Sequence, residues 1–213
     1  MNLTVFDLDH TLLKVNSSFR FGSFLYKNSY FSCWRAFACI SDYFRYEWFG
    51  LSIYELHHRI FRRLFEGRNS LEICNFAAKF LTESFEEMLY SPALERLNEA
   101  MARGDYVVIL SSSPDFLVEQ IANRLHVVHW KGTKYCTNEQ GFFYRIASVM
   151  EGEEKAKVLA ELSENLKLSK ENITVYSDSH LDLPMLNMAG RPVGADPNFQ
   201  LKRICLRNGW EII

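Results

Sequence analysis

A pair of aspartates, placed directly after a short apolar run near the N-terminus, narrows the choice of fold. The run occupies residues 3–6 and is followed by Asp7-Leu8-Asp9. A short run of this kind predicts a buried strand of a parallel sheet. In open α/β sheets the carboxyl ends of the strands face the crevice that binds ligands. We therefore expect Asp7 and Asp9 to lie in a site.

The composition excludes several classes of protein. At 213 residues the chain can form one core with a smaller insertion. A net charge of −2 offers no basic surface for nucleic acid, and no stretch predicts a transmembrane segment. The 5 cysteines are an odd number without a Cys-x-x-Cys pair, which indicates neither a disulfide framework nor a zinc site. This cysteine usage favours a cytoplasmic protein.

Residues 14–90 have the apolar spacing of helices, which predicts a helical block inserted after the first strand. Aromatic residues crowd between Phe19 and Phe49. These rings either form the core of the block or, if the block covers the acidic site, line an apolar pocket or a partner surface. We expect His57 and His58 to be solvated helix residues.

A second strand is predicted at residues 106–110, and it also ends in polar residues. Ser111, Ser112 and Ser113 follow it and precede Pro114. Serine and proline are typical of helix starts, so we expect the serines to cap the next helix. A strand, a polar loop and a helix start together form an anion site. Alternatively, Ser111 caps the helix without binding a ligand.

The C-terminal half alternates between strands and helices. Lys155 lies at the start of a helix, where it is either a solvated surface charge or part of the site. Asp178 and Asp182 follow a buried strand and lie four positions apart, so they can face the same way; otherwise they serve the helix N-terminus. The predicted elements are strands at residues 127–130, 135–146 (with a turn at Gly141), 173–176 and 193–195, and helices at residues 152–166 and 201–207.

These strand ends together predict a site for phosphoryl transfer. In a parallel sheet with right-handed crossovers the carboxyl ends lie along one edge, so Asp7, Ser111 and Asp178 converge. Carboxylates suit Mg²⁺ bound together with a substrate phosphate. A carboxylate can attack phosphorus. Ser111, Lys155 and the metal would then offset the charge of the transition state.

The order and type of these motifs resemble the haloacid dehalogenase-like (HAD) phosphohydrolases. The narrower resemblance is to their subfamily IB, which contains phosphoserine phosphatase-like enzymes and carries a helical cap after the first motif. The resemblance implies an α/β fold, with a Rossmann-like parallel-sheet core formed by residues 1–13 and 91–213. It also implies an inserted helical cap of the C1 type at residues 14–90.

The resemblance also implies roles for single residues. Asp7 would be the nucleophile and a metal ligand, and Asp9 would be the general acid/base with its carbonyl oxygen on the metal. Asp178 would be the other metal ligand. The remaining matched residues are Ser111, Ser112 and Lys155, which would bind phosphate, and Asp182, which would support the metal and its water.

We therefore expect a Mg²⁺-dependent phosphomonoesterase that acts on a small molecule through an aspartyl-phosphate. Two alternatives stay open: transfer of the phosphoryl group to an alcohol, and a catalytically weak module that binds phosphate or lipid through the aromatic cap. Asn16 replaces an acid of phosphoserine phosphatases, which disfavours L-phosphoserine. Leu181 replaces an Asn that contacts the phosphate side of the site. The aromatic block favours a substrate with an apolar portion.

Overall fold

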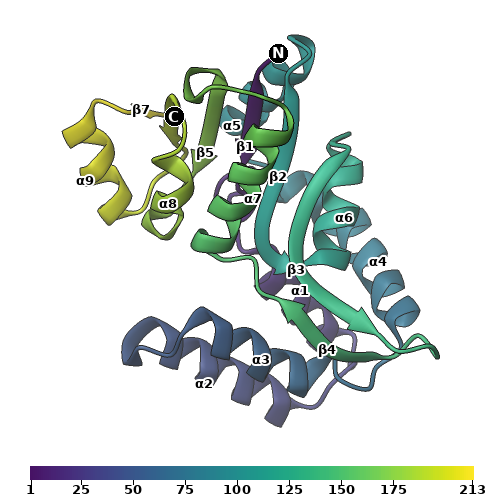
Figure 1. The fold of residues 1–213 in the computed structure, drawn as a ribbon. Helices are drawn as coiled ribbons and strands as arrows, with labels where there is room; N and C mark the ends of the chain where they lie inside the picture. Colours follow the sequence, from purple (N-terminus) through teal and green to yellow (C-terminus); the bar gives the residue numbers. More distant parts are fainter.

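The computed structural model describes residues 1–213, apart from the side chain of Glu47. Its centre is a seven-stranded sheet in the order β4-β3-β2-β1-β5-β6-β7, in which only the β3–β4 pair is antiparallel. Figure 1 shows helices on both faces of this sheet. The fold is therefore the α/β arrangement predicted from the sequence. The strands are β1 Leu3–Phe6, β2 Tyr106–Pro114, β3 His129–Thr137, β4 Phe143–Ser148, β5 Ile173–Ser177, β6 Arg191–Gly194 and β7 Glu211–Ile212.

The helices divide between the segment after β1 and the crossovers of the sheet. Five helices, α1 to α5, follow β1 before the chain returns to the sheet. The α-helices are α1 Ser17–Lys27, α2 Cys33–Phe49, α3 Ile53–Leu64, α4 Ser70–Met88, α5 Ser91–Ala102, α6 Asp115–Arg124, α7 Gly152–Asn165, α8 Leu183–Leu186 and α9 Phe199–Asn208. Within the described part of the chain, no helix has an apolar stretch long enough to cross a membrane.

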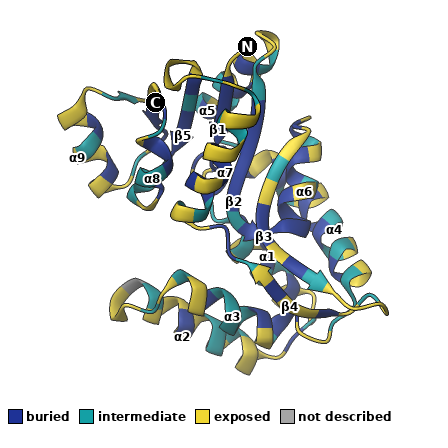
Figure 2. Cartoon of the chain, viewed as in Figure 1, coloured by how far each residue is buried: buried dark blue, intermediate teal, exposed yellow. Residues whose placement is uncertain are grey.

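The first strand is central because it is apolar on both faces. Val5 and Phe6 are fully buried in separate clusters, since successive side chains of a strand point to opposite faces. Phe6 stacks on Tyr176 of the neighbouring strand, with 4.5 Å between ring centroids. Figure 2 shows β1, β2 and β5 largely buried. Burial on both faces holds the carboxyl ends of these strands in fixed positions.

The register of the sheet decides which residues emerge together. Phe6 of β1 is paired with Ile109 of β2 and with Tyr176 of β5. The residues just beyond these pairs are therefore level with one another at the same edge. Asp7, Ser111 and Asp178 are the polar residues that this register brings to the edge.

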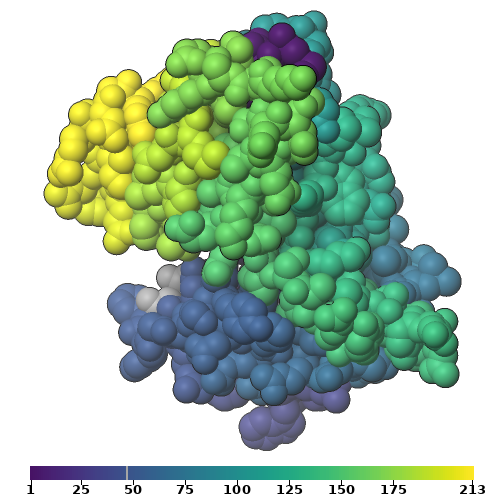
Figure 3. Space-filling model, viewed as in Figure 1, coloured from purple at the N-terminus to yellow at the C-terminus, as the bar shows by residue number. Residues whose placement is uncertain are grey.

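The inserted segment has two parts that pack differently. Helices α2 and α3 form a hairpin, in which Asp42 is buried against Arg63 at 2.7 Å. This hairpin lies beyond the carboxyl ends of the central strands and beside β4, as Figures 1 and 3 show. Helix α4 packs instead against α6, where Gln120 donates a hydrogen bond of 3.0 Å to the carbonyl of Cys74. The proposed cap boundaries at residues 14 and 90 stay a prediction, and α2 and α3 are the helices that cover the strand ends.

The aromatic residues of the insertion do not form a single core. Phe21 of α1 is buried against Phe80 and Phe116, with ring centroids 5.7 and 6.1 Å away. On α2, in contrast, Trp34 and Trp48 are more than three-quarters exposed, at 78% and 76%. The core interpretation is therefore wrong for most of α2, because α3 is its main packing partner and many of its large side chains are left exposed.

Candidate active site

The carboxylates that follow β1 and β5 are held side by side by backbone contacts. The amide of Asp7 donates to the carbonyl of Tyr176 at 2.9 Å, which fixes the end of β1 to β5. The amide of Asp178 donates to Thr11 Oγ1 at 3.0 Å. The same Thr11 oxygen lies 3.4 Å from both Asp7 Oδ2 and Asp178 Oδ1. The convergence of Asp7 with Asp178 that the sequence predicted is present.

Lys155 joins this group from the first turn of α7. Helix α7 begins at Gly152, where a Cβ atom would collide with the carbonyl oxygen of Leu181, so the helix start and the loop after β5 approach closely. Lys155 Nζ lies 2.6 Å from Asp7 Oδ1 and 2.9 Å from Asp182 Oδ2. The ammonium is buried, with 4% of the residue exposed, so it is not a solvated surface charge.

Asp182 is the most enclosed carboxylate of the group. Besides the Lys155 ammonium, its Oδ2 accepts a hydrogen bond of 2.8 Å from Ser177 Oγ at the end of β5. A one-turn 3₁₀ helix, His180–Asp182, returns its side chain toward Asp7. The structure therefore brings Asp178 and Asp182 to one side, as their spacing predicted.

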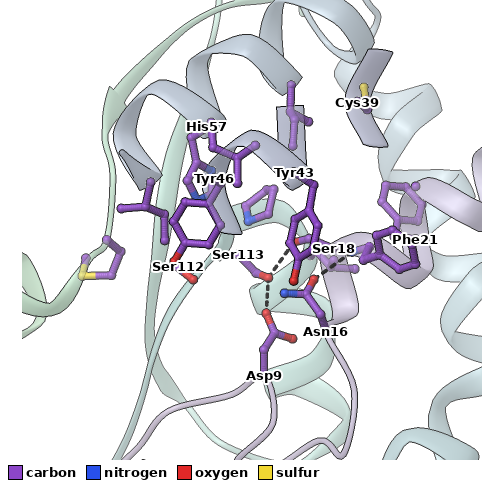
Figure 4. Close-up of a pocket in the computed structure, with 18 of the residues that line it drawn as sticks. Asp9, Asn16, Ser18, Phe21, Cys39, Tyr43, Tyr46, His57, Ser112 and Ser113 are labelled. Carbon is purple, nitrogen blue, oxygen red and sulfur yellow. Dashed lines mark hydrogen bonds between the residues drawn. The ribbon is translucent and has the colours of Figure 1, made fainter. Parts of the chain in front are cut away.

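Asp9 is held by a different set of donors. Ser17 donates its backbone amide to Asp9 Oδ1 at 2.7 Å, and Ser113 donates its hydroxyl to Asp9 Oδ2 at 2.6 Å. Ser113 Oγ also lies 2.6 Å from Ser18 Oγ at the start of α1. Figure 4 shows Asp9, Ser113 and Ser18 as one connected group beneath the cap helices. Both carboxylate oxygens of Asp9 are thus oriented by the protein.

The three serines after residue 110 belong to a strand and not to a helix cap. Strand β2 continues to Pro114, and α6 begins at Asp115 without a side-chain cap, so the predicted capping role is wrong. The strand is extended because Thr133 of β3 donates to the carbonyl of Ser112 at 2.6 Å. Ser111 is fully buried and its Oγ accepts from the amide of Ser113 at 3.1 Å, whereas Ser112 lines the cavity described below.

Burial and mutual repulsion raise the pKa values of the carboxyl groups in this site. Burial, and then Asp182 and Asp9, raise the pKa of Asp7 to about 7, against the opposing effect of the Lys155 ammonium. Burial, Asp7 and Asp182 together raise the pKa of Asp178 to about 8. Burial disfavours the ammonium, but Asp182 and Asp7 outweigh it and raise the pKa of Lys155. A single lysine does not neutralise these carboxylates, so the group favours a further cation.

The donor set fits a hard divalent ion such as Mg²⁺. Within the described residues, no group of three or more His, Cys, Asp and Glu side chains is arranged to hold a metal. Mg²⁺ typically needs only one or two carboxylates and completes its shell with waters and substrate phosphate. Asp7 and Asp178, bridged by Thr11, supply two carboxylates without a sulfur or imidazole ligand.

A large cavity connects these residues with the cap. Its volume is about 1210 Å³, and its lining runs from Asp7 and Lys155 to apolar residues of α1, α2 and α3. Figure 4 shows Tyr43 and Tyr46 extending from the cap toward the level of Ser112, Ser113 and Asp9. The active-site carboxylates therefore lie at one end of a pocket much larger than a phosphate group.

Two residues that the sequence analysis discussed, His57 and Asn16, line this cavity. His57 lines it and is half-buried, as is His58, so neither is the fully solvated helix residue that was expected; burial, followed by His58, lowers the pKa of His57 from 6.5 to about 4. The sequence missed this because a polar residue on an amphipathic helix is usually exposed. Asn16 also lines the cavity, but its Oδ1 caps α1 by accepting from the amide of Phe19 at 2.8 Å.

Comparison with known proteins places the chain in a family. Residues 4–187 match the family model of the haloacid dehalogenase-like hydrolases. The chain belongs to this family. As a haloacid dehalogenase-like hydrolase it is an enzyme, which confirms the resemblance seen in the sequence.

The relatives of this hydrolase include named phosphatases. It is 25% identical over 211 residues to a phosphoserine phosphatase of Mycobacterium tuberculosis, an alignment that covers 97% of this chain and 68% of the relative. It is 24% identical over 219 residues to a histidinol-phosphatase of Neisseria meningitidis serogroup C, covering 100% and 98% of the two chains. A crystal structure of a Bordetella pertussis protein of unknown function has the same fold, with a TM-score of 0.88, 24% identity and coverage of 99% and 97%.

The sequence analysis gave three polar residues of the site no contact with its aspartates. Thr11 bridges Asp7 and Asp178, and Ser113 and Ser18 are hydrogen-bonded around Asp9. Thr11 follows Asp9 in the motif and could have been found from that position. Ser18 had no signal, because it reaches the site only through the packing of α1 against β2.

Proposed function

We propose that this haloacid dehalogenase-like hydrolase is a Mg²⁺-dependent phosphomonoesterase that acts through an aspartyl-phosphate. The observation that carries the proposal is the position of Asp7. Its Oδ1 lies 2.6 Å from the buried Lys155 ammonium, and its Oδ2 shares Thr11 with Asp178. A carboxylate between an ammonium and a cation-binding partner suits attack on a phosphoryl group. The phosphatase names of two relatives support the same reaction class.

The metal would be held by the side chains of Asp7 and Asp178 and by the carbonyl oxygen of Asp9. When bound, Mg²⁺ supplies positive charge against the phosphoryl oxygens. Asp182 supports this arrangement by keeping Lys155 in place at 2.9 Å. The raised pKa values of Asp7 and Asp178 favour such an ion, since a cation stabilises their ionised forms.

The phosphate group would be bound by the Lys155 ammonium and by Ser112, which lines the cavity; Ser111, the other predicted phosphate ligand, is fully buried and is not among the lining residues. Asp7 attacks the phosphorus, and the bond from phosphorus to the substrate oxygen breaks. Asp9 gives its proton to the leaving oxygen, so an alcohol departs. Asp9 then takes a proton from water, the water oxygen attacks the phosphorus, and phosphate is released with Asp7 restored.

The orientation of Asp9 supports its role as acid and base. Ser17 and Ser113 hold the two Asp9 oxygens at 2.7 and 2.6 Å, so the carboxyl group has a fixed direction.

The 5 cysteines are all free, which supports our assignment of the protein to a reducing cytoplasm.

Phosphate release from a panel of phosphomonoesters, with Mg²⁺ and with EDTA, tests this function. We expect Mg²⁺-dependent turnover of p-nitrophenyl phosphate, abolished by Asp7→Asn, because an amide is neither a good nucleophile nor an anionic ligand. Asp105→Asn is the matched control, because Asp105 lies beside Asn2 and Thr4 at the opposite ends of β1 and β2. Equal turnover by Asp7→Asn and the wild type would refute the mechanism.

The same assay separates the alternatives. Added glycerol that becomes phosphorylated would indicate a phosphotransferase. Tight binding of phosphate esters without turnover would indicate a binding module instead of an enzyme.

A further inference from the structure

The cavity above the active site has two chemically different ends. Its charged lining residues come from the ends of β1 and β5 and from the start of α7, with the exception of Lys27 at the end of α1. The other end, which we name the cap chamber, is lined by Phe21, Ala36, Cys39, Leu56, Ile60 and Leu64. These residues come from three helices of the inserted segment, so the chamber is built by the cap.

Most side chains that the cap helices place in the cavity are apolar; the polar ones are Ser18, Ser23, Tyr26, Lys27, Tyr43, Tyr46 and His57. Asn16, which also lines the cavity, uses its carboxamide oxygen to cap α1. His57 is kept neutral, since burial lowers its pKa to about 4. Burial likewise raises the pKa of the Cys39 thiol to about 11. Two titratable groups on different helices thus both report an environment that disfavours charge.

The volume also exceeds the needs of a small polar ester. Pockets that bury drug-sized ligands measure about 300–1,000 Å³, and this cavity measures about 1210 Å³. A phosphate at Lys155 would occupy one end of it. The rest of the substrate would face the apolar lining of the cap chamber.

We propose that the cap chamber binds the hydrocarbon portion of the substrate, so that the preferred substrates are phosphate monoesters of long-chain alcohols or of other amphiphilic alcohols. This inference rests on the proposed phosphomonoesterase function and adds the substrate class. A hydrocarbon chain gains affinity from burial without needing hydrogen-bond partners. A nucleoside would instead place polar edges against apolar side chains such as Phe21, Leu56 and Leu64.

Gly22 offers a direct way to test the chamber. It lies on α1 and lines the cavity, and no atom lies within 4 Å of the position that a Cβ would take. A large side chain at this position would therefore occupy open space in the cavity instead of colliding with the core. Gly22→Ala changes the helix in the same way without filling that space.

The first experiment measures kcat/KM for n-alkyl phosphates from ethyl to decyl, each below its critical micelle concentration, beside L-phosphoserine. Each buried methylene should raise kcat/KM about threefold until the chamber is full. We expect octyl phosphate to exceed both ethyl phosphate and L-phosphoserine about 100-fold or more. A ratio of octyl to ethyl phosphate below threefold, or a preference for L-phosphoserine, would overturn the inference.

The second experiment repeats the series with Gly22→Phe and Gly22→Ala. We expect Gly22→Phe to lower kcat/KM for octyl phosphate at least tenfold and to change ethyl phosphate less than twofold. Gly22→Ala should leave the ratio of the two substrates within threefold of the wild type. Equal losses on both substrates in Gly22→Phe would overturn the inference, and the wild-type series decides the matter if Gly22→Phe does not fold.

The two proposals fail in different ways. No phosphate release from any ester, including p-nitrophenyl phosphate with Mg²⁺, would refute the proposed function. Release that does not depend on chain length would leave that function standing and refute only the role of the cap chamber.

Discussion

Replacing Lys155 with methionine removes the one ammonium that the structure places between two buried carboxylates. Methionine keeps much of the length and volume of the side chain, so the change is mainly one of charge. It leaves Asp7 and Asp182 without the partner that lies 2.6 and 2.9 Å away. Both carboxylates are largely buried, at 6% and 3% exposure, so water replaces only part of the lost interaction.

The expected cost follows from these contacts. At an effective dielectric constant of about 20, one ion pair at about 3 Å is worth about 5 kcal/mol before desolvation. Desolvation of the ammonium offsets part of the attraction in the two ion pairs. Removing one partner, on the other hand, leaves a buried carboxylate unpaired. We therefore expect the unfolding free energy to fall by about 3–5 kcal/mol at pH 7.5.

The loss should depend on pH in a defined direction. The pKa of Asp7 is already raised to about 7, so below this value Asp7 is largely neutral and its attraction to Lys155 disappears. At pH 5 the difference between wild type and Lys155→Met should therefore fall by about half. Above pH 7 the variant carries a penalty that grows with pH, because without Lys155 the pKa of Asp7 rises further, and on folding the carboxyl must take up a proton that the unfolded chain has already lost.

Urea denaturation at pH 5 and pH 7.5, in EDTA, measures both quantities. Lys157→Met is the matched control, since Lys157 lies on the same helix, is 70% exposed and contacts only Glu154 at the surface, at 3.2 Å. The control should lose less than about 0.5 kcal/mol. A loss for Lys155→Met below 1 kcal/mol, or one that is equal at the two pH values, would refute the reasoning.

Two further outcomes are expected. Ser113→Ala removes the 2.6 Å donor to Asp9 and should lower kcat about tenfold or more, with KM changed less than threefold. Ser113→Thr should restore activity, and the control Ser163→Ala, on the outer part of α7, should have no effect. A change in KM alone would contradict this positioning role. His57→Phe should make the unfolding free energy depend less on pH in acid, because unfolded wild type binds a proton between pH 6.5 and 4 that the folded protein excludes. In urea denaturation, wild type should lose about 2 kcal/mol more than the variant between pH 7 and 4.5. Equal losses in the two proteins would count against the burial of His57.

The catalytic end of the cavity could be predicted from the sequence because it is encoded at strand ends. Asp7 and Asp178 each follow an apolar run, and parallel strands place such residues at one edge whatever the length of chain between them. Lys155 was predicted on the same logic, from a helix that starts beside that edge. These positions depend on topology alone, and the observed register of β1 with β2 and β5 is the one that topology requires.

The supporting contacts could not be predicted, because they depend on how elements pack. Ser113 was interpreted as a helix cap, since serine before a helix usually is one. The pairing of β3 with β2 extends β2 instead, and the Ser113 hydroxyl then faces Asp9. His57 was misplaced for a related reason, since helical periodicity gives the face of a helix but not what covers it.

The catalytic residues and the cap chamber lie on different kinds of element in this hydrolase. Residues that perform chemistry are fixed by strands buried on both faces, whereas the substrate chamber is lined by helices with few neighbours in the fold. Helix α2 packs mainly on α3 and carries Cys39 and Tyr43 into the cavity. Substitutions on α2 can therefore change the shape of the chamber without moving Asp7 or Lys155. If the cap chamber binds the hydrocarbon portion of the substrate, as we propose, such substitutions should change which alcohol is accepted and leave the catalytic residues in place.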